Sequence, residues 1–350
     1  MLNFYPGPSK IYPQVKQWTA EAFESGILEQ NHRSDSFMNL LKNTIENFKT
    51  AQAIPANYSV YFTSSATECW EIVNQSLLHG KVQFAYNGAF GKKWFKYAVT
   101  NHTPFLEEIR GSRFEINETL VKVDIDESND CLCFIHNETS NGSSVKTNHL
   151  DGISPDTYRF IDATSSLGGL LLPWDQGDVW LCSTQKCLGL PSGMGIMVVS
   201  DRILSKATEL GEKNHYNSFL TIATNFEKYQ THYTPNILLI YLLNEVAKNF
   251  EDISKIDKRV KSNSKHLYDF IDQHNLLNPL ISAEECRSET VLSIAASENI
   301  IRRIHEKAQK NEIILGRGYG EWKENSFRIA NFPAHNPDDF HQLKAFLGTI

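Results

Sequence analysis

The 350-residue chain lacks several features that would assign a protein to a class at once. Its six cysteines contain no CxxC pair, the spacing that holds zinc, and most of them lie inside apolar stretches. We interpret them as buried free thiols in a reducing compartment and expect no metal site. No apolar run has the length of a membrane span, and the first residues lack the basic and apolar segments of a signal peptide. We therefore expect a cytoplasmic protein without a membrane partner.

Positive charge is also scarce. Lysine and arginine number 34 against 41 acidic residues, which gives a formal net charge of −7. A nucleic-acid partner requires basic surface to neutralise its phosphates, so this balance excludes a general nucleic-acid binder. The hydrophobic share of 41% and the charged share of 21% are typical of a globular protein, and the length exceeds one ordinary core. We expect one large domain and a smaller one.

The pattern of apolar residues favours an α/β fold. Between about residues 58 and 200, strand-forming stretches recur with helical or loop segments between them, which is typical of a mainly parallel sheet. Residues 1–14 contain three prolines and should form an extended arm, whereas residues 237–272 are amphipathic and are predicted to form one long helix. We therefore predict a large domain over residues 15–245 and a small α+β domain made of residues 1–14 and 246–350.

A lysine and an aspartate each come at the end of an apolar stretch. Lys186 comes shortly after the apolar stretch at residues 178–182. Asp162 ends the predicted strand that precedes this stretch in the chain, at residues 158–162. A lysine held in a cleft at a strand end is partly desolvated, which lowers its pKa and makes its amine a nucleophile. By itself such a lysine is usually only a solvated charge. Together, the two residues suit pyridoxal phosphate (PLP), which requires a lysine for its aldehyde and a carboxylate beside its ring nitrogen.

Small hydroxyl residues mark a candidate phosphate cradle. Ser65, Ala66 and Thr67 lie between a predicted strand and a predicted helix, where backbone N–H groups and the helix dipole favour an anion. An ordinary capped helix start is the alternative. Phe90 stands between two glycines just past another strand, free to lie flat over a planar ring, although it could equally be a core residue.

Further polar residues follow other strands. Asn137 and Thr139 come after the apolar residues 131–135, at the edge of a sheet where ligands bind in α/β folds. His32 and Arg33 precede a predicted helix capped by Ser34 or Asp35 and could bind an anion or could simply be an exposed pair. Arg328 lies in an apolar strand context and should be paired with a structural carboxylate or with a substrate anion.

In this order, these residues resemble the class V aminotransferases of the PLP-dependent fold-type I superfamily. The segments Asn3-Phe4-Tyr5-Pro6-Gly7-Pro8, His32-Arg33-Ser34 and His136-Asn137-Glu138-Thr139 are most similar to phosphoserine aminotransferase. The resemblance implies a mainly parallel seven-stranded sheet, a PLP cofactor, and amino-acid and 2-keto-acid substrates. It also implies a homodimer whose active sites are shared between subunits and the reaction of phosphoserine with 2-oxoglutarate in serine biosynthesis.

The resemblance also implies roles for single residues. Lys186 bonds the cofactor and moves the substrate proton, Asp162 pairs with the ring nitrogen, and Phe90 stacks on the ring. Arg328 holds the substrate carboxylate. Other residues contact the cofactor or an anion: Ser65, Ala66, Thr67 and Gln185 at the phosphate, Asn137 and Thr139 at the ring oxygen, Tyr233 and Thr234 across the dimer, and His32 with Arg33 as a clamp.

The chain departs from phosphoserine aminotransferases at two places. Their cradle loop commonly has an arginine, whereas residues 64–67 have none, and residues 320–325 lack the His-Arg pair expected before Arg328. An alanine–glyoxylate or serine–glyoxylate aminotransferase, which needs no pocket for a substrate phosphate, is therefore the alternative. A cysteine desulfurase is disfavoured because Phe90 stands where that family stacks a histidine, and a binding protein without activity is disfavoured because Asp162, Gln185 and Lys186 are all present.

Overall fold

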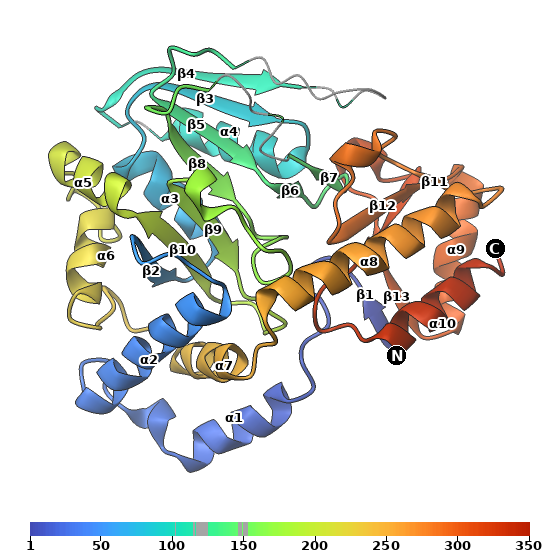
Figure 1. Cartoon of the computed structure of the whole chain (residues 1–350), viewed down its shortest axis with the longest axis horizontal. Coiled ribbons are helices and arrows are strands. Elements are labelled where there is room, and N and C mark those ends of the chain that lie inside the picture. The colour runs from blue at the N-terminus through green and yellow to red at the C-terminus, as the bar shows by residue number, and fades with distance from the viewer. Residues whose placement is uncertain (102, 115, 117–124, 146–148, 150–152) are drawn as a thin grey trace.

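The computed structural model of the chain describes residues 1–101, 103–114, 116, 125–145, 149 and 153–350. Its larger part is built on a seven-stranded sheet in the order β2-β10-β9-β8-β5-β3-β4 (Figure 1). The antiparallel pairs are those that β10 makes with β2 and β9, and the strands from β9 to β4 are parallel. The predicted α/β class with a mainly parallel sheet is confirmed. The strands are β2 (Tyr58–Thr63), β3 (Gly80–Tyr86), β4 (Leu106–Arg113), β5 (Cys131–Ile135), β8 (Tyr158–Asp162), β9 (Val179–Ser183) and β10 (Gly195–Ser200).

The central strands β5 and β9 are largely apolar, which fits a sheet covered on both faces. Every residue of β5 and of β9 is buried, as expected for parallel strands between layers of helices. Two helices that contact each other, α3 and α4, pack against the sheet. Ser34, not Asp35, caps α2, since its side chain accepts a hydrogen bond from the N–H of Phe37. The helices of this part are α1 (Val15–Glu24), α2 (Asp35–Ala51), α3 (Ala66–Ser76), α4 (Ala89–Thr100), α5 (Asp201–Leu210), α6 (Phe219–Phe226) and α7 (Ile237–Lys248).

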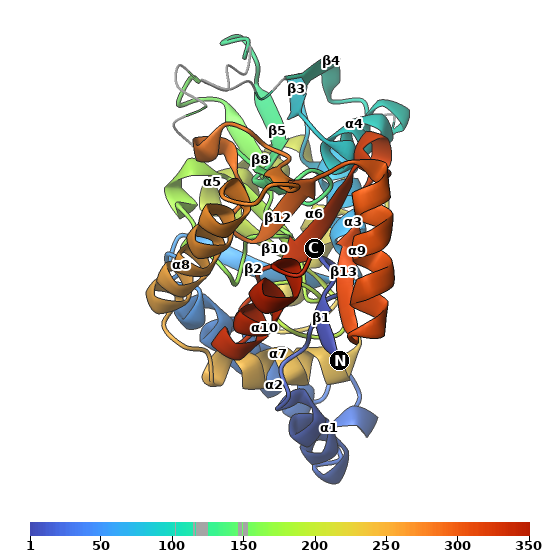
Figure 2. The same ribbon diagram turned by 90° about the vertical axis from the view of Figure 1, so that its right-hand side faces the viewer.

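A second sheet joins the two ends of the chain. Its order is β1-β13-β14-β12-β11, so the first strand of the chain pairs with a strand more than 300 residues later, Leu2 lying opposite Ile313. Figure 2 views the molecule from the side of this sheet, with helices around its strands. The strands are β1 (Leu2–Phe4), β11 (Asn278–Pro279), β12 (Val291–Ala295), β13 (Ile313–Arg317) and β14 (Ser326–Ala330), and the helices are α8 (Ile253–Asp272), α9 (Glu298–Lys310) and α10 (Pro337–Leu347).

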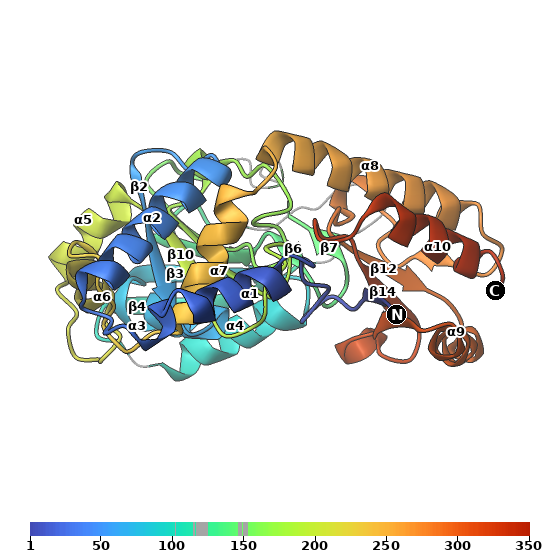
Figure 3. The same ribbon diagram turned by 90° about the horizontal axis from the view of Figure 1, so that it is seen from below.

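The prediction of one helix over residues 237–272 is wrong. The segment forms two helices, α7 and α8, because Asp252 caps a new helix by accepting a hydrogen bond from the N–H of Ser254 at 2.8 Å. Helix α8 then runs from the large sheet toward the small one (Figure 3). Its first half, including Val260, packs in the larger core, and its second half, including Leu267, packs in the smaller core.

A short two-stranded ribbon, β6 (Asn137–Glu138) with β7 (Ser143–Ser144), lies beyond the end of β5. A single residue, His136, separates it from the buried strand, and all four of its residues are buried. Within the described part of the chain, no helix combines the length and the apolar character that crossing a bilayer requires.

Candidate active site

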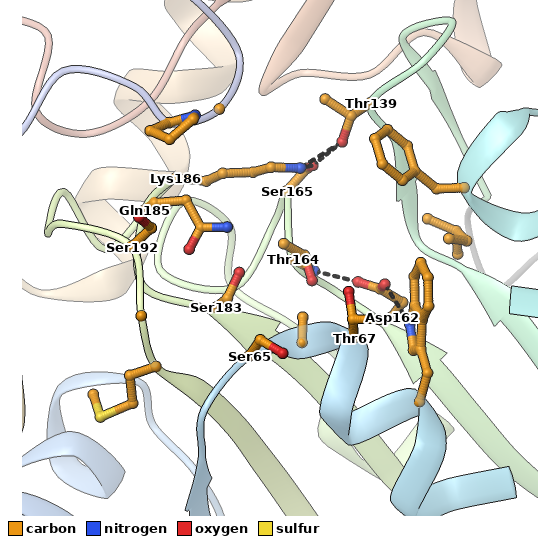
Figure 4. Close-up of a pocket in the computed structure, with 18 of the residues that line it drawn as sticks. Ser65, Thr67, Thr139, Asp162, Thr164, Ser165, Ser183, Gln185, Lys186 and Ser192 are labelled. Carbon is orange, nitrogen blue, oxygen red and sulfur yellow. Dashed lines mark hydrogen bonds between the residues drawn. The ribbon is translucent and has the colours of Figure 1, made fainter. Parts of the chain in front are cut away.

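A cavity of about 300 Å³ opens where the parallel strands end. Asp162 ends β8, Ser183 ends β9 and Ile135 ends β5, and all three line the cavity together with the first turn of α3. The carboxyl edge of an open α/β sheet is where such folds bind ligands. Lys186 and Asp162, which the sequence predicts to act as a pair, line this same cavity, Asp162 from the end of β8 and Lys186 from the segment after β9 (Figure 4).

The amine of Lys186 is held by two hydroxyl groups. Its Nζ donates to Thr139 Oγ1 and to Ser165 Oγ, both at 2.7 Å, and these two hydroxyls also bond each other. Burial lowers the pKa of Lys186 to about 8, although the negative charge of Asp162 acts in the opposite direction. Gly7, with φ of +146°, packs on the stem of the lysine, since a Cβ there would lie 3.0 Å from Lys186 Cε. The lysine is therefore fixed and only weakly basic.

Asp162 is buried with two donors on its carboxyl group. The backbone N–H of Thr164 donates to one oxygen at 2.7 Å, and Trp70 Nε1 donates to the other at 2.9 Å. Burial raises the pKa of Asp162, and these hydrogen bonds and the charge of Lys186 oppose that rise. A cationic N–H placed beside this group would favour its ionised form further.

The start of α3 forms one wall of the cavity. The side chain of Ser65 caps the helix by accepting a hydrogen bond from the N–H of Glu68 at 3.1 Å. The N–H groups of Ala66 and Thr67 also belong to the first turn, where a helix provides no backbone acceptor for them. Strand β10 lies close to this helix start, since a Cβ on Gly195 would lie only 2.4 Å from the carbonyl group of Ser65. Such a helix start is a site for an anion.

Three buried polar atoms of the cavity wall lack a hydrogen-bond partner among the residues that the structure describes. They are Asn137 Oδ1, Thr164 Oγ1 and Ser183 Oγ. Buried polar atoms are normally satisfied, so three together at one cavity indicate a missing polar ligand.

Comparisons with known proteins agree with this geometry. The family model of class V aminotransferases matches residues 1–319. The chain belongs to the class V aminotransferases. A phosphoserine aminotransferase of Rhodococcus opacus is 25% identical to it, covering 97% of this chain and 92% of the relative. The crystal structure of a phosphoserine aminotransferase from Cytophaga hutchinsonii matches with a TM-score of 0.89 and 29% identity, covering 99% and 98% of the two chains. An alanine–glyoxylate aminotransferase from Nostoc sp., at 18% identity and a TM-score of 0.79 over 99% and 94% of the chains, shares the fold.

As a class V aminotransferase, the chain is a PLP-dependent enzyme, and its cavity fits that cofactor. The cavity combines an amine, a buried carboxyl group, an anion site at a helix start and unpartnered polar atoms. The amine and the anion site match the aldehyde and the phosphate of PLP, and the carboxyl group matches its ring nitrogen. Gln185 also lines the cavity, and its contact with the cofactor phosphate stays a prediction.

An aromatic stack connects the cavity of the aminotransferase to the segment between β13 and β14. The ring of Phe90 lies 5.6 Å from Lys186 Nζ and stacks on Tyr319, with ring centroids 5.3 Å apart. Arg328 Cζ lies 5.4 Å from the centroid of the Tyr319 ring, and its guanidinium group donates to the carbonyls of Arg317 and Thr139, both at 2.8 Å. Arg328 is buried and forms no ion pair with a carboxylate among the described residues, and burial lowers its pKa. The structural ion pair considered from the sequence is therefore not found.

Five predicted residues do not line this cavity. Arg328 is one of them, and the other four lie elsewhere in the chain. His32 and Arg33 lie on the loop before α2, and Tyr233 and Thr234 lie before α7, where Thr234 is exposed. The resemblance assigns these four residues to the site of the other subunit, and that assignment stays a prediction.

Sequence reasoning missed several residues of the site. Thr164, Ser165 and Ser183 line the cavity, and the first two come two and three positions after Asp162, so a closer interpretation of that strand end could have found them. Trp70 lies 92 positions from the aspartate that it contacts, and no local pattern indicates such a pairing.

Proposed function

We propose that this aminotransferase transfers the amino group of phosphoserine to 2-oxoglutarate, with Lys186 and Asp162 as the central pair. The observation that carries the proposal is the single cavity in which a weakly basic lysine and a buried aspartate meet an anion site. The phosphoserine aminotransferases among its relatives, which align over nearly the whole chain, support the substrate.

The residues of the chain have distinct tasks in this proposal. PLP, when bound, supplies a carbonyl group for the amino group and a ring that withdraws electrons from the substrate Cα. Lys186 removes and returns the proton at that Cα, since its lowered pKa leaves part of the amine uncharged near neutral pH. Asp162 keeps a proton on the ring nitrogen, and Phe90 covers the ring and excludes water. Arg328 holds the substrate α-carboxylate, for which it has no competing ion pair in the described chain.

Other residues bind the cofactor phosphate. The N–H groups of Ala66 and Thr67 would receive it at the start of α3, with Ser65 and Gln185 beside them. Asn137 and Thr139 would contact the ring oxygen. Tyr233 and Thr234 would reach the phosphate of the other subunit in a homodimer, and His32 with Arg33 would bind the substrate anion there. The enzyme would act in the cytoplasm in serine biosynthesis.

The direct test is a half-reaction. The purified protein should show a near-visible absorption band that phosphoserine removes, and borohydride should attach the cofactor irreversibly to Lys186, as peptide mapping can establish. A Lys186→Ala variant should bind cofactor without irreversible attachment. Attachment to a different lysine would refute the assignment.

An alanine–glyoxylate or serine–glyoxylate aminotransferase is the second candidate, and two observations favour it. Residues 64–67 contain no arginine, and Glu321, in the segment that lacks the His-Arg pair, forms an ion pair with Arg113 at 3.0 Å. The same half-reaction with phosphoserine, alanine and serine discriminates between them. The phosphoserine proposal requires a kcat/KM for phosphoserine at least tenfold above that for serine.

A further inference from the structure

Glu138 is a buried carboxyl group beside the active site that the proposed mechanism does not use. It is 1% exposed and does not line the cavity. One oxygen accepts from the N–H of Ser140 at 3.0 Å, from the hydroxyl of the same residue at 2.6 Å and from the N–H of Phe90 at 3.4 Å. The other oxygen accepts from the N–H of Gly91 at 3.0 Å. Both carboxyl oxygens of Glu138 therefore accept hydrogen bonds from groups beside the active site, at Ser140, Phe90 and Gly91.

These contacts replace the missing cap of helix α4. Gly88 occupies the N-cap position and has no side chain to accept a hydrogen bond. The N–H of Ala89 donates to Ser140 Oγ at 2.9 Å, and the next two N–H groups of the helix go to Glu138. A carboxylate at a helix start is favoured by the helix dipole as well as by the hydrogen bonds. Only glycine fits at position 88, since a Cβ there would lie 2.3 Å from Glu138 Cγ.

The capped turn carries the aromatic ring of the site. Phe90 is the second residue of α4, and its ring faces Lys186 Nζ at 5.6 Å. Thr139, the next residue after Glu138 in the chain, accepts the hydrogen bond of Lys186 at 2.7 Å. Glu138 therefore connects, through two short backbone segments, the ring that covers the cavity and the hydroxyl that holds the lysine.

We propose that Glu138 is a positioning residue of the aminotransferase, which sets the Phe90 ring and the Thr139 hydroxyl relative to Lys186. The proposal rests on the cofactor-stacking role proposed for Phe90. An amide cannot replace the carboxyl group, because its NH₂ end would face an N–H donor where an acceptor is required. The side chain at position 138 must therefore have the length of glutamate and end in two acceptor oxygens.

The test compares Glu138→Gln with a matched control, Glu212→Gln. Glu212 is also buried and accepts from Ser76 Oγ, the N–H of Asn214 and His215, but it does not line the cavity. The holoenzymes are compared by the rate at which PLP dissociates and by the visible circular dichroism per bound cofactor, which reports how the ring is held. Glu138→Gln should release PLP at least tenfold faster with a reduced dichroic signal. Glu212→Gln should keep both values within twofold of the parent.

Two outcomes would overturn the proposal. One is a Glu138→Gln protein with the release rate and dichroism of the parent, and the other is equal changes in both variants. If Glu138→Gln does not fold, the Glu138→Asp variant provides the test, because it keeps two acceptor oxygens on a shorter side chain. This variant should release PLP faster than the parent, by less than tenfold, and should lose a measurable part of the dichroic signal. Parental values in that variant contradict the proposal. Both readouts use the cofactor alone, so they remain decisive if phosphoserine is not the substrate.

Discussion

Replacing Lys186 by methionine should change the stability of the cofactor-free protein in a pH-dependent way. Burial lowers the pKa of this lysine from 10.5 to about 8. Between these two pH values the unfolded chain binds more protons at this position than the folded chain does, so stability rises with pH. Each pKa unit corresponds to about 1.4 kcal/mol, and the shift therefore costs the folded protein ~3 kcal/mol when the amine must be protonated at pH 7.

Methionine removes that cost because it fills a similar volume without a charge. The difference in unfolding free energy between Lys186→Met and the parent should be largest near pH 7. It should shrink by roughly 2.5 kcal/mol by pH 10, where the amine of the parent is almost wholly neutral in the folded state but still mostly protonated in the unfolded state. Ionisation of the tyrosines affects both proteins alike and cancels in the difference.

The assay is urea unfolding of both proteins at equal concentration, in steps from pH 7 to pH 10. Lys96→Met is the control, because Lys96 is exposed and its difference from the parent should stay constant over this range. A difference for Lys186→Met that is equally constant would refute the reasoning, since it would mean that water reaches the amine in the folded protein.

Three further predictions concern other residues in or beside the site. Asp162→Asn removes the ionisable partner of the ring nitrogen and should lower kcat by about 10²-fold or more with unchanged unfolding cooperativity, measured by steady-state kinetics. Trp70→Phe removes one hydrogen-bond donor from Asp162, which should raise the pKa of that carboxyl group further. The acid limb of the plot of kcat/KM against pH should then move to higher pH, and an unmoved limb would contradict this prediction. Gly88→Ala should cost ~1–3 kcal/mol in urea unfolding because its Cβ meets buried Glu138, whereas Gly348→Ala, with its nearest neighbour at 3.4 Å, should stay within about 0.5 kcal/mol.

Local patterns in the sequence were sufficient to find the strand ends of the site. An apolar stretch that stops at a polar residue marks the carboxyl edge of a buried strand, and this pattern alone indicates Asp162, Lys186, Asn137 and Thr139. All four line the cavity. The same kind of pattern failed for residues 237–272, because apolar periodicity continues across the break that Asp252 introduces.

What the sequence by itself determined is the order of strands and helices and the residues at their ends, because these depend on neighbours within a few positions. The tertiary structure alone decided which distant groups meet: Trp70 with Asp162, Arg328 with the carbonyl of Thr139, and Glu138 with the start of α4. These contacts join segments 47 to 189 positions apart. Their hydrogen bonds form only when the sheet and its covering helices are packed, since packing brings the donors and acceptors within reach and removes the competing water.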